Sequence, residues 1–418
     1  MRALLYGLGA LRAVIRARDL QCHQLTVLSA VSGGAIGAAF AASRVNLSSA
    51  TLAEYDEKVL KPAVWTVTHR SLMFGGRQVW VVALAALAAL AGGMLVGVCG
   101  FGLDTIPRVA VAGAAICAVP PILSFRGLAI ERSMRDVLFG HDQPITDVDS
   151  GTHLVLQTTD LTSGEATYLT SRGVSSYRWG EAPGAGPSLV RAARSAATFP
   201  VVFGPVRMRS PAFTGGHEKA PGHLWFVDGG IYDNMGSEWL LNEKRTDKGV
   251  YMIVVNASRN LVTQRFPFYL PVIGELATLK REMDVQYDAT TAPRRRWMRD
   301  LFRFGARTGT LVAIDKRLTA WVRSFLDGPE PRRGRALAMK AVMDAAPGRA
   351  AFASWPDTNS AVKTNLGKVR LGSARDLVRA GYLGTAIQTH ILDDWPAPEE
   401  MDPDALMNWL GDQPPTAS

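Results

Sequence analysis

The sequence predicts an α/β protein with a three-layer α/β/α core, into which a transmembrane helical hairpin is inserted. Strand-like apolar runs alternate with helical patterns on both sides of residues 79–125, and that interval holds two long runs without a charged residue. With 418 residues the chain can bury a large core. We expect residues 1–78 and 126–395 to form two parts of one core domain, 79–125 the hairpin, and 396–418 a mobile tail rich in proline and acidic residues.

The first part of the core begins with a helix, a strand and a second helix. Leucine and isoleucine recur at helical spacing from Arg2 to Arg18, with arginines between them, which predicts an amphipathic helix. The apolar run Leu25–Val31 predicts a strand, and the small residues of Gly33–Ser43 predict the helix that follows it. A further helical pattern covers Thr51–Thr66.

Ser32 lies at the break between that strand and its helix. A serine on a sharp strand-to-helix turn has its hydroxyl lifted clear of the sheet, beside the first N–H groups of the helix, which suits a nucleophile whose product is an oxyanion. Gly33 and Gly34 allow the backbone and a substrate to approach closely. The pattern G-x-S-x-G is met only in part, because its first position is Ala30; the alternative is a glycine-rich turn with an ordinary serine.

Two uncharged runs predict the hairpin. Val79–Leu103 has 25 residues, enough at about 1.5 Å per residue to cross a hydrocarbon core of about 30 Å. Val109–Phe125 has 17 residues, which is near the lower limit for a span, and a re-entrant or interfacial segment is the alternative. The link between the runs carries only Arg108, whereas several basic residues flank the pair, which predicts a cytoplasmic core: Lys61, Arg70, Arg77, Arg126, Arg132 and Arg135.

The second part of the core resumes the alternation of strands and helices. We expect strands at His153–Gln157, Ala166–Thr170, Leu224–Val227 and Val250–Val255, and helices at Leu189–Ala197, through most of Pro271–Leu326, and as a pair within Ser373–Ile391. Between the last two helical regions, Glu330–Arg335 reads as a solvated linker because it combines a proline with three arginines.

Asp228 is the candidate partner of Ser32. It follows the strand Leu224–Val227 and precedes Gly229 and Gly230, so its carboxylate should emerge at the C-terminal end of that strand, the edge where open α/β sheets place their sites. An aspartate has an ordinary pKa near 3.9, so it needs partial burial to act as a base. The alternative is a plain Asp-Gly-Gly turn. If both residues share one site, they lie on one side of the membrane, which favours two crossings over one.

Net charge and cysteine content indicate which binding partners and which metal or disulfide sites to expect. A net charge of +9 fits either nucleic acid or an anionic lipid surface, but no nucleic-acid-binding pattern is visible, so we expect a membrane partner and no nucleic acid. The three cysteines, Cys22, Cys99 and Cys117, are widely spaced and two fall in apolar runs. We therefore expect reduced thiols, no disulfide framework and no metal site. The oligomeric state is not indicated.

Four blocks of sequence together resemble the bacterial members of the patatin-like phospholipase family. In the family's order along the chain, they are Ser29–Gly34, Thr158–Gly164, Ala193–Pro205 and Val227–Gly236. The resemblance implies a patatin-like hydrolase core, a Ser–Asp dyad of Ser32 and Asp228 without a histidine, an oxyanion donor at the Gly33 N–H, and supporting roles for Gly34, Gly229 and Gly230. It implies hydrolysis of acyl esters in phospholipid or lysophospholipid, without a cofactor.

The start of the chain departs from the family pattern. Members begin with a strand and a glycine-rich loop, Gly-Gly-Gly-x-Arg, that supplies most of the oxyanion hole. Met1–Gly9 resembles the family's segment from that arginine onward, which makes Arg2 the counterpart and leaves the loop missing. We expect the loop to be encoded upstream. The alternative is a catalytically impaired relative that binds lipid or acts as a scaffold. A third possibility, a Ser–His–Asp triad, would need a late histidine, for which His390 is the candidate.

Overall fold

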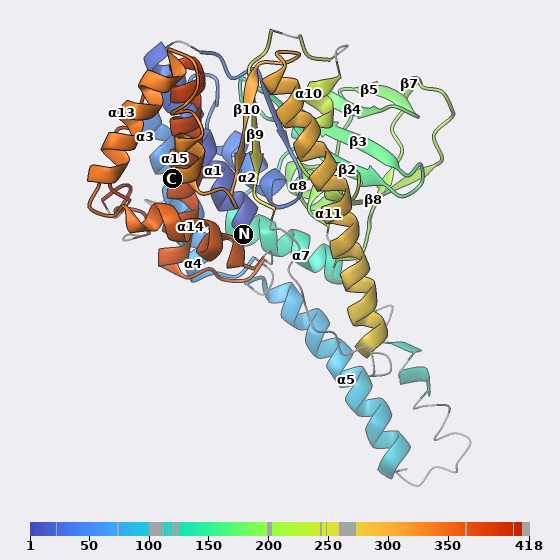
Figure 1. Cartoon of the computed structure of the whole chain (residues 1–418). Helices are drawn as coiled ribbons and strands as arrows, with labels where there is room; N and C mark the ends of the chain where they lie inside the picture. The colour runs from blue at the N-terminus through green and yellow to red at the C-terminus, as the bar shows by residue number, and fades with distance from the viewer. Residues whose placement is uncertain are drawn as a thin grey trace.

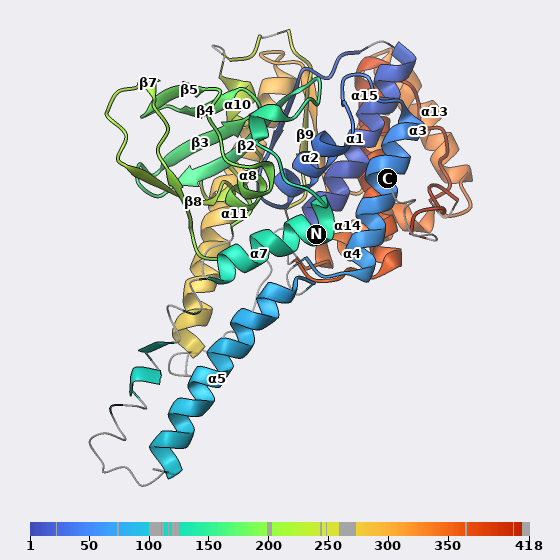
Figure 2. The ribbon, with the colours of Figure 1, turned by 180° about the vertical axis from the view of Figure 1, so that it is seen from behind.

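The computed structural model describes residues 1–21, 23–72, 75–99, 125–198, 203–242, 245–247, 249–258, 273–363, 366–403 and 405–411, with isolated residues between 110 and 122. Its elements form a body of helices and strands from which one long helix projects (Figures 1 and 2). The α/β class predicted from the sequence is confirmed by this mixture of a sheet and packed helices.

The larger sheet contains eight described strands and is built around β2 (His153–Asp160), every residue of which is buried. An antiparallel meander extends from one edge of β2, and β8 and β6 follow its other edge in antiparallel order. β1 pairs in parallel with the first half of β2. The remaining strands are β1 (Val27–Ala30), β3 (Glu165–Thr170), β4 (Gly173–Ser176), β5 (Gly180–Pro183), β6 (Val206–Arg209), β7 (Thr214–Gly215) and β8 (His223–Asp228).

A separate pair of strands, β9 (Met252–Asn256) and β10 (Gly309–Ala313), runs in parallel. Parallel neighbours need a long crossover, which here contains the 31-residue helix α11 (Ile273–Arg303). The sequence predicted helices through most of Pro271–Leu326 and missed β10. This strand has only five residues, and it is stabilised by pairing with β9, which lies far away in sequence.

Helices α1 (Arg2–Gln21) and α15 (Leu371–Asp393) pack together at the centre of the helical half of the body (Figure 1). Glycines permit this close approach: a Cβ at Gly9 would lie 2.0 Å from the Val378 carbonyl oxygen, and one at Gly381 would lie 2.1 Å from the Tyr6 carbonyl oxygen. α1 is therefore buried over most of its surface instead of on one face. α15 is one continuous helix where a helical pair was expected.

Further helices surround this centre. They are α2 (Ser32–Arg44), α3 (Leu52–Tyr55), α4 (Lys61–His69), α7 (Arg126–Met134), α8 (Leu189–Ala196), α9 (Gly230–Asp233), α10 (Glu238–Leu241), α12 (Leu318–Arg323), α13 (Arg332–Ala345) and α14 (Ala350–Ala361), with π-helical turns at Asp56–Leu60 and Arg135–Phe139 and a 3₁₀ turn at Ile145–Asp147. The first turn of α13 occupies most of the segment that we expected to be a linker.

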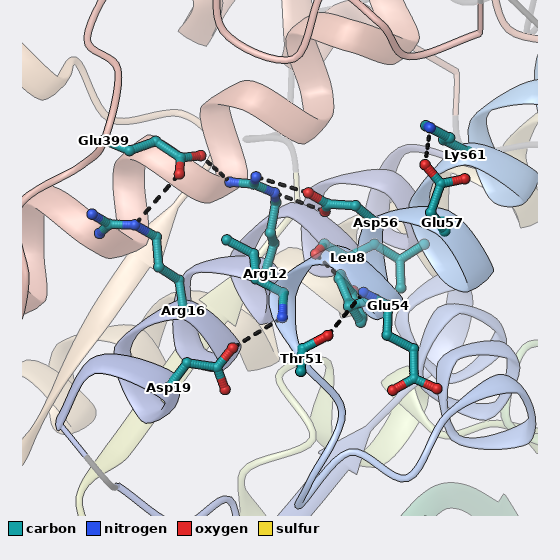
Figure 3. A network of polar contacts seen from close by, with 12 residues as sticks. Leu8, Arg12, Arg16, Asp19, Thr51, Glu54, Asp56, Glu57, Lys61 and Glu399 are labelled. Atoms are coloured by element: carbon teal, nitrogen blue, oxygen red, sulfur yellow. Dashed lines mark hydrogen bonds and ion pairs between the residues drawn. The ribbon is translucent and has the colours of Figure 1, made fainter.

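A network of charged side chains holds the C-terminal segment on α1 (Figure 3). The Arg12 guanidinium donates to both carboxylate oxygens of Asp56, at 2.8 and 2.9 Å, and to Glu399 at 2.8 Å. Beyond Glu399, four apolar side chains are buried: Met401, Leu406, Met407 and Leu410. Residues 396–418 were expected to be a mobile tail, but these four apolar residues pack into the main hydrophobic core.

α5 (Arg77–Cys99) is the helix that projects from the body (Figures 1 and 2). Among the described residues it is the one helix long and apolar enough to cross a membrane, and only 11% of its window Val79–Val96 is buried. Large apolar side chains are exposed along it, including Leu84, Leu87 and Met94. The second predicted span, Val109–Phe125, lies almost entirely outside the described residues. The hairpin is therefore not shown, whereas one candidate span is.

Candidate active site

Two strands that run toward each other bring the candidate site together. β1 pairs in parallel with β2 from Val27 opposite His153 to Ala30 opposite Leu156. β8 pairs antiparallel with the rest of the same edge of β2, and ends with Asp228 opposite Thr158. The C-terminal ends of β1 and β8 therefore meet beside Gln157. The sequence predicted that both residues follow strand ends, but here those ends face each other, instead of lying side by side at one edge of a parallel sheet.

Ser32 occupies a strained turn directly after β1. Its φ is +53°, a left-handed conformation that is uncommon for a residue with a side chain. Val31 before it is extended, and α2 begins at Ser32. Holding such a conformation costs about 1–3 kcal/mol, and residues that keep it often lie at functional sites. The backbone thus reverses within one residue and presents the Ser32 hydroxyl at the end of the strand, as in a nucleophile elbow.

The Ser32 hydroxyl donates a hydrogen bond to Asp228. The distance between Ser32 Oγ and Asp228 Oδ2 is 2.9 Å. The other carboxylate oxygen, Oδ1, accepts the Gly230 N–H at 2.8 Å, and the Asp228 N–H donates to the Thr198 carbonyl at 2.9 Å. With 1% of its surface exposed, the Asp228 carboxylate is fixed in one orientation and has almost no access to bulk water.

Burial makes this carboxylate a better base. It raises the pKa of Asp228 from 3.8 to about 6, against the opposing effect of the hydrogen bonds from Gly230 and Ser32. The cause is the loss of hydration, which disfavours the charged form. At neutral pH the group is still ionised, but it accepts a proton more readily than an ordinary aspartate does. A base is most effective when its pKa is close to the working pH.

The glycines after Asp228 are required for close packing. A Cβ at Gly229 would lie 2.3 Å from the Gln157 carbonyl oxygen, and one at Gly230 would lie 2.7 Å from Cε1 of Tyr287. Neither position can take a larger residue without a shift of its neighbours. These two glycines let the loop after β8 pass directly over the middle of β2 and against α11.

The glycines after Ser32 leave space at the first turn of α2. Nothing lies within 4 Å of the position of a Cβ at Gly34, and a Cβ at Gly33 would touch only Ala3 and Leu4 of α1. The first three N–H groups of a helix have no carbonyl partner within the helix, and the first such bond here is made by the Ala35 N–H. The N–H groups of Gly33 and Gly34 therefore have no carbonyl partner within α2.

A family model described as "Patatin-like phospholipase" matches residues 1–238, a range that includes both Ser32 and Asp228. The chain belongs to the patatin-like phospholipase family. The family is one of lipid acyl hydrolases, so membership supports a hydrolase with a lipid substrate at this general level. Comparison with curated proteins finds no match.

Arg2, the expected counterpart of the family's arginine, begins α1. Its guanidinium is buried and donates to the Ser360 carbonyl at 2.7 Å, so it connects α1 to the end of α14. The neighbouring residue Ala3 is the one that faces Gly33. Arg2 therefore fixes the start of α1, whose first turn packs on the first turn of α2.

The histidines that could contradict a two-residue site have other partners. The ring nitrogen Nδ1 of His390 lies 2.6 Å from the Trp395 carbonyl oxygen. His217 packs against Tyr177, and His223 faces Arg207 across β6 and β8. None of these contacts involves Ser32 or Asp228. Among the described residues, no cluster of three or more histidine, cysteine, aspartate or glutamate side chains could hold a metal ion.

Sequence reasoning missed two residues that shape the site. Asp233, fully buried after β8, accepts the N–H groups of Met235, Ser237 and Glu238 and lies 3.2 Å from the guanidinium of Arg294 on α11. Tyr287, also on α11, packs on Gly230. Asp233 lies inside the family-like block Val227–Gly236, which could have revealed it. Nothing in the sequence signals Tyr287, because α11 reaches the site only in the folded protein.

Proposed function

We propose that the protein is a membrane-anchored serine hydrolase that cleaves acyl esters of phospholipid or lysophospholipid through a Ser32–Asp228 dyad. The observation that carries this proposal is the 2.9 Å hydrogen bond between a serine on a strained elbow and a buried carboxylate with a raised pKa. Family membership supports the lipid acyl ester as substrate class. The dyad needs no cofactor.

In the proposed reaction, Asp228 accepts the proton of the Ser32 hydroxyl as Oγ attacks the carbonyl carbon of the ester. The resulting oxyanion binds to the N–H groups at the first turn of α2, including that of Gly33. The bond from the carbonyl carbon to the alcohol oxygen then breaks, and Asp228 returns its proton to the departing alcohol. Water attacks the acyl-enzyme while Asp228 takes its proton, and Ser32 recovers that proton as the free fatty acid leaves.

Membrane anchoring is proposed through α5 and the uncharged run that follows it. The exposed apolar surface of α5 would be costly in water and is favourable in lipid. α4 before it and α7 after it both lie at the end of the body from which α5 projects (Figures 1 and 2). This supports two crossings. The flanking basic residues favour a cytoplasmic body.

The test is labelling of the full chain in membranes with a fluorophosphonate probe, combined with turnover of lysophospholipid. We expect wild type to be labelled and Ser32→Ala to be unlabelled. Ser29→Ala is the matched control, because Ser29 also has a hydroxyl at the end of β1, but donates it to the Gly236 carbonyl at 2.6 Å. Equal labelling of wild type and Ser32→Ala would remove the proposed nucleophile.

The alternative, an impaired relative that binds or scaffolds lipid, gives a different result in the same experiment. It predicts neither labelling nor turnover for wild type in membranes, with retained binding to lipid vesicles. In this alternative the oxyanion hole lacks the donors of the glycine-rich loop, and removal of even one oxyanion donor reduces hydrolysis by about 10²- to 10³-fold. Labelling of Ser32 together with turnover above that of Asp228→Asn would therefore exclude this alternative.

A further inference from the structure

A cavity of about 350 Å³ lies between β8, α7, α9 and α11. Its walls are mainly apolar and include Phe203, Val227, Ile231, Met283 and Tyr287, with Arg126 and Gln286 as polar contributors. Phe203 and Val227 are buried and form the inner part, whereas Leu161 and Gln286 are exposed at the rim. A ligand could therefore enter from solvent and reach an apolar interior.

The cavity lies close to the loop that holds the proposed base. Val227 directly precedes Asp228, and Ile231 follows two residues after Gly229. Tyr287 touches the position of a Cβ at Gly230, the residue whose N–H binds the Asp228 carboxylate. A chain that occupies the cavity would thus pack against Tyr287, close to the loop that positions Asp228.

The outer wall comes from α11, which lies beyond residues 1–238 that match the family model. Met283, Gln286 and Tyr287 share one face of this helix, because residues three and four apart lie together. Val285 lies on a different face and is 44% exposed. α7 lies at the end of the body from which α5 projects, and α11 runs along the body and extends past it at that same end (Figures 1 and 2). The cavity is therefore bounded by two helices that extend toward the base of α5.

We propose that this cavity binds the single acyl chain of the scissile ester and that Met283 limits the length of that chain. This inference rests on the proposed hydrolase function. The volume is near the lower end of ligand cavities, about 300–1,000 Å³, which suits one acyl chain and not two. The apolar lining favours methylene groups. The half-buried Met283 is the residue whose enlargement would shorten the cavity without a change in the dyad.

The first experiment measures kcat/KM of the full chain for p-nitrophenyl esters of increasing chain length. Each methylene that binds in an apolar site contributes about fourfold. We expect Met283→Trp to remove that gain for the longer esters and to shift the optimum to shorter chains, whereas Met283→Ala shifts it to longer ones. Val285→Trp is the matched control, with the same new side chain on an exposed face. Identical profiles for Met283→Trp and wild type would overturn the inference.

A second measurement separates this inference from the proposed catalysis. Fatty acids of different lengths displace a fluorescent fatty acid from the Ser32→Ala variant, which cannot turn over. We expect the double variant Ser32→Ala/Met283→Trp to lose affinity for long chains and to keep it for short ones. If that result is obtained and the wild-type protein is inactive, the cavity binds acyl chains as inferred, but the proposed hydrolase function is refuted. Unchanged affinity for long chains in the double variant would refute the cavity assignment, whatever the activity of wild type.

Discussion

Replacement of Asp228 by asparagine should strongly reduce activity and stabilise the protein. An asparagine side chain has the same shape, and its carbonyl oxygen can accept the Gly230 N–H as Oδ1 does now. Its amide cannot take the proton of Ser32. Loss of a positioned general base reduces rates by about 10²- to 10⁴-fold, so we expect kcat/KM to fall by that factor.

The gain in stability follows from the pKa of Asp228. Its rise from 3.8 to about 6 corresponds to about 3 kcal/mol. Because the folded state binds the proton more tightly than the unfolded chain, the ionised carboxylate lowers the free energy of unfolding above pH 6, and that cost disappears as the pH falls toward 3.8. Asp228→Asn removes the charge. We therefore expect a free energy of unfolding higher by up to about 3 kcal/mol at pH 7.

The assay combines hydrolysis of a soluble short-chain ester with urea unfolding of the detergent-solubilised chain, followed by tryptophan fluorescence. Asp233→Asn is the matched control: this carboxylate is also buried, but it is paired with Arg294 and accepts three backbone N–H groups. Its replacement should lower stability by about 2–3 kcal/mol. An Asp228→Asn protein that is active, or less stable than wild type at pH 7, would refute the reasoning.

Three further results are expected. The kcat/KM of wild type for an uncharged ester should fall below a pH of about 6, as Asp228 becomes protonated; a flat profile down to about pH 4.5 would exclude it as the base. Ser32→Gly should be more stable than Ser32→Ala by about 1 kcal/mol in urea unfolding, because glycine adopts the φ of +53° without strain, and equal stabilities would contradict a strained elbow. Gly229→Ala should lower stability by about 1–3 kcal/mol, because its Cβ would lie 2.3 Å from the Gln157 carbonyl oxygen, and an unchanged unfolding midpoint would argue against this packing.

Local sequence predicted the elements around the nucleophile well. Leu25–Val31 and Gly33–Ser43 were expected as strand and helix, and they correspond to β1 and α2. The strand expected at His153–Gln157 corresponds to β2 and extends to Asp160. These segments contain apolar runs bounded by glycines or polar residues, and such patterns favour a strand, a turn or a helix through interactions between near neighbours in the chain. The resemblance of four sequence blocks to the family predicted roles for single residues, which hydrophobic periodicity alone does not indicate.

The errors lie where distant contacts override local pattern. Gly309–Ala313 is a strand because it pairs with β9, although helical pattern surrounds it. Residues 396–411 lack a strong periodicity, but they bury Leu406 and Leu410 and are held by the ion pair between Arg12 and Glu399. In both places the stabilising partner is far away in sequence, so no local window reveals it.

From the sequence by itself, a serine at a strand-to-helix break, an aspartate before two glycines and a long uncharged helix could be recognised, since each depends on residues close together in the chain. Only the tertiary structure decided that β1 and β8 meet head to head on β2, which brings Ser32 Oγ within 2.9 Å of Asp228. It also decided the burial that raises the pKa of Asp228 and the wall that α11 adds to the cavity. These features depend on packing between segments up to hundreds of residues apart, and side-chain chemistry within a segment does not specify that packing.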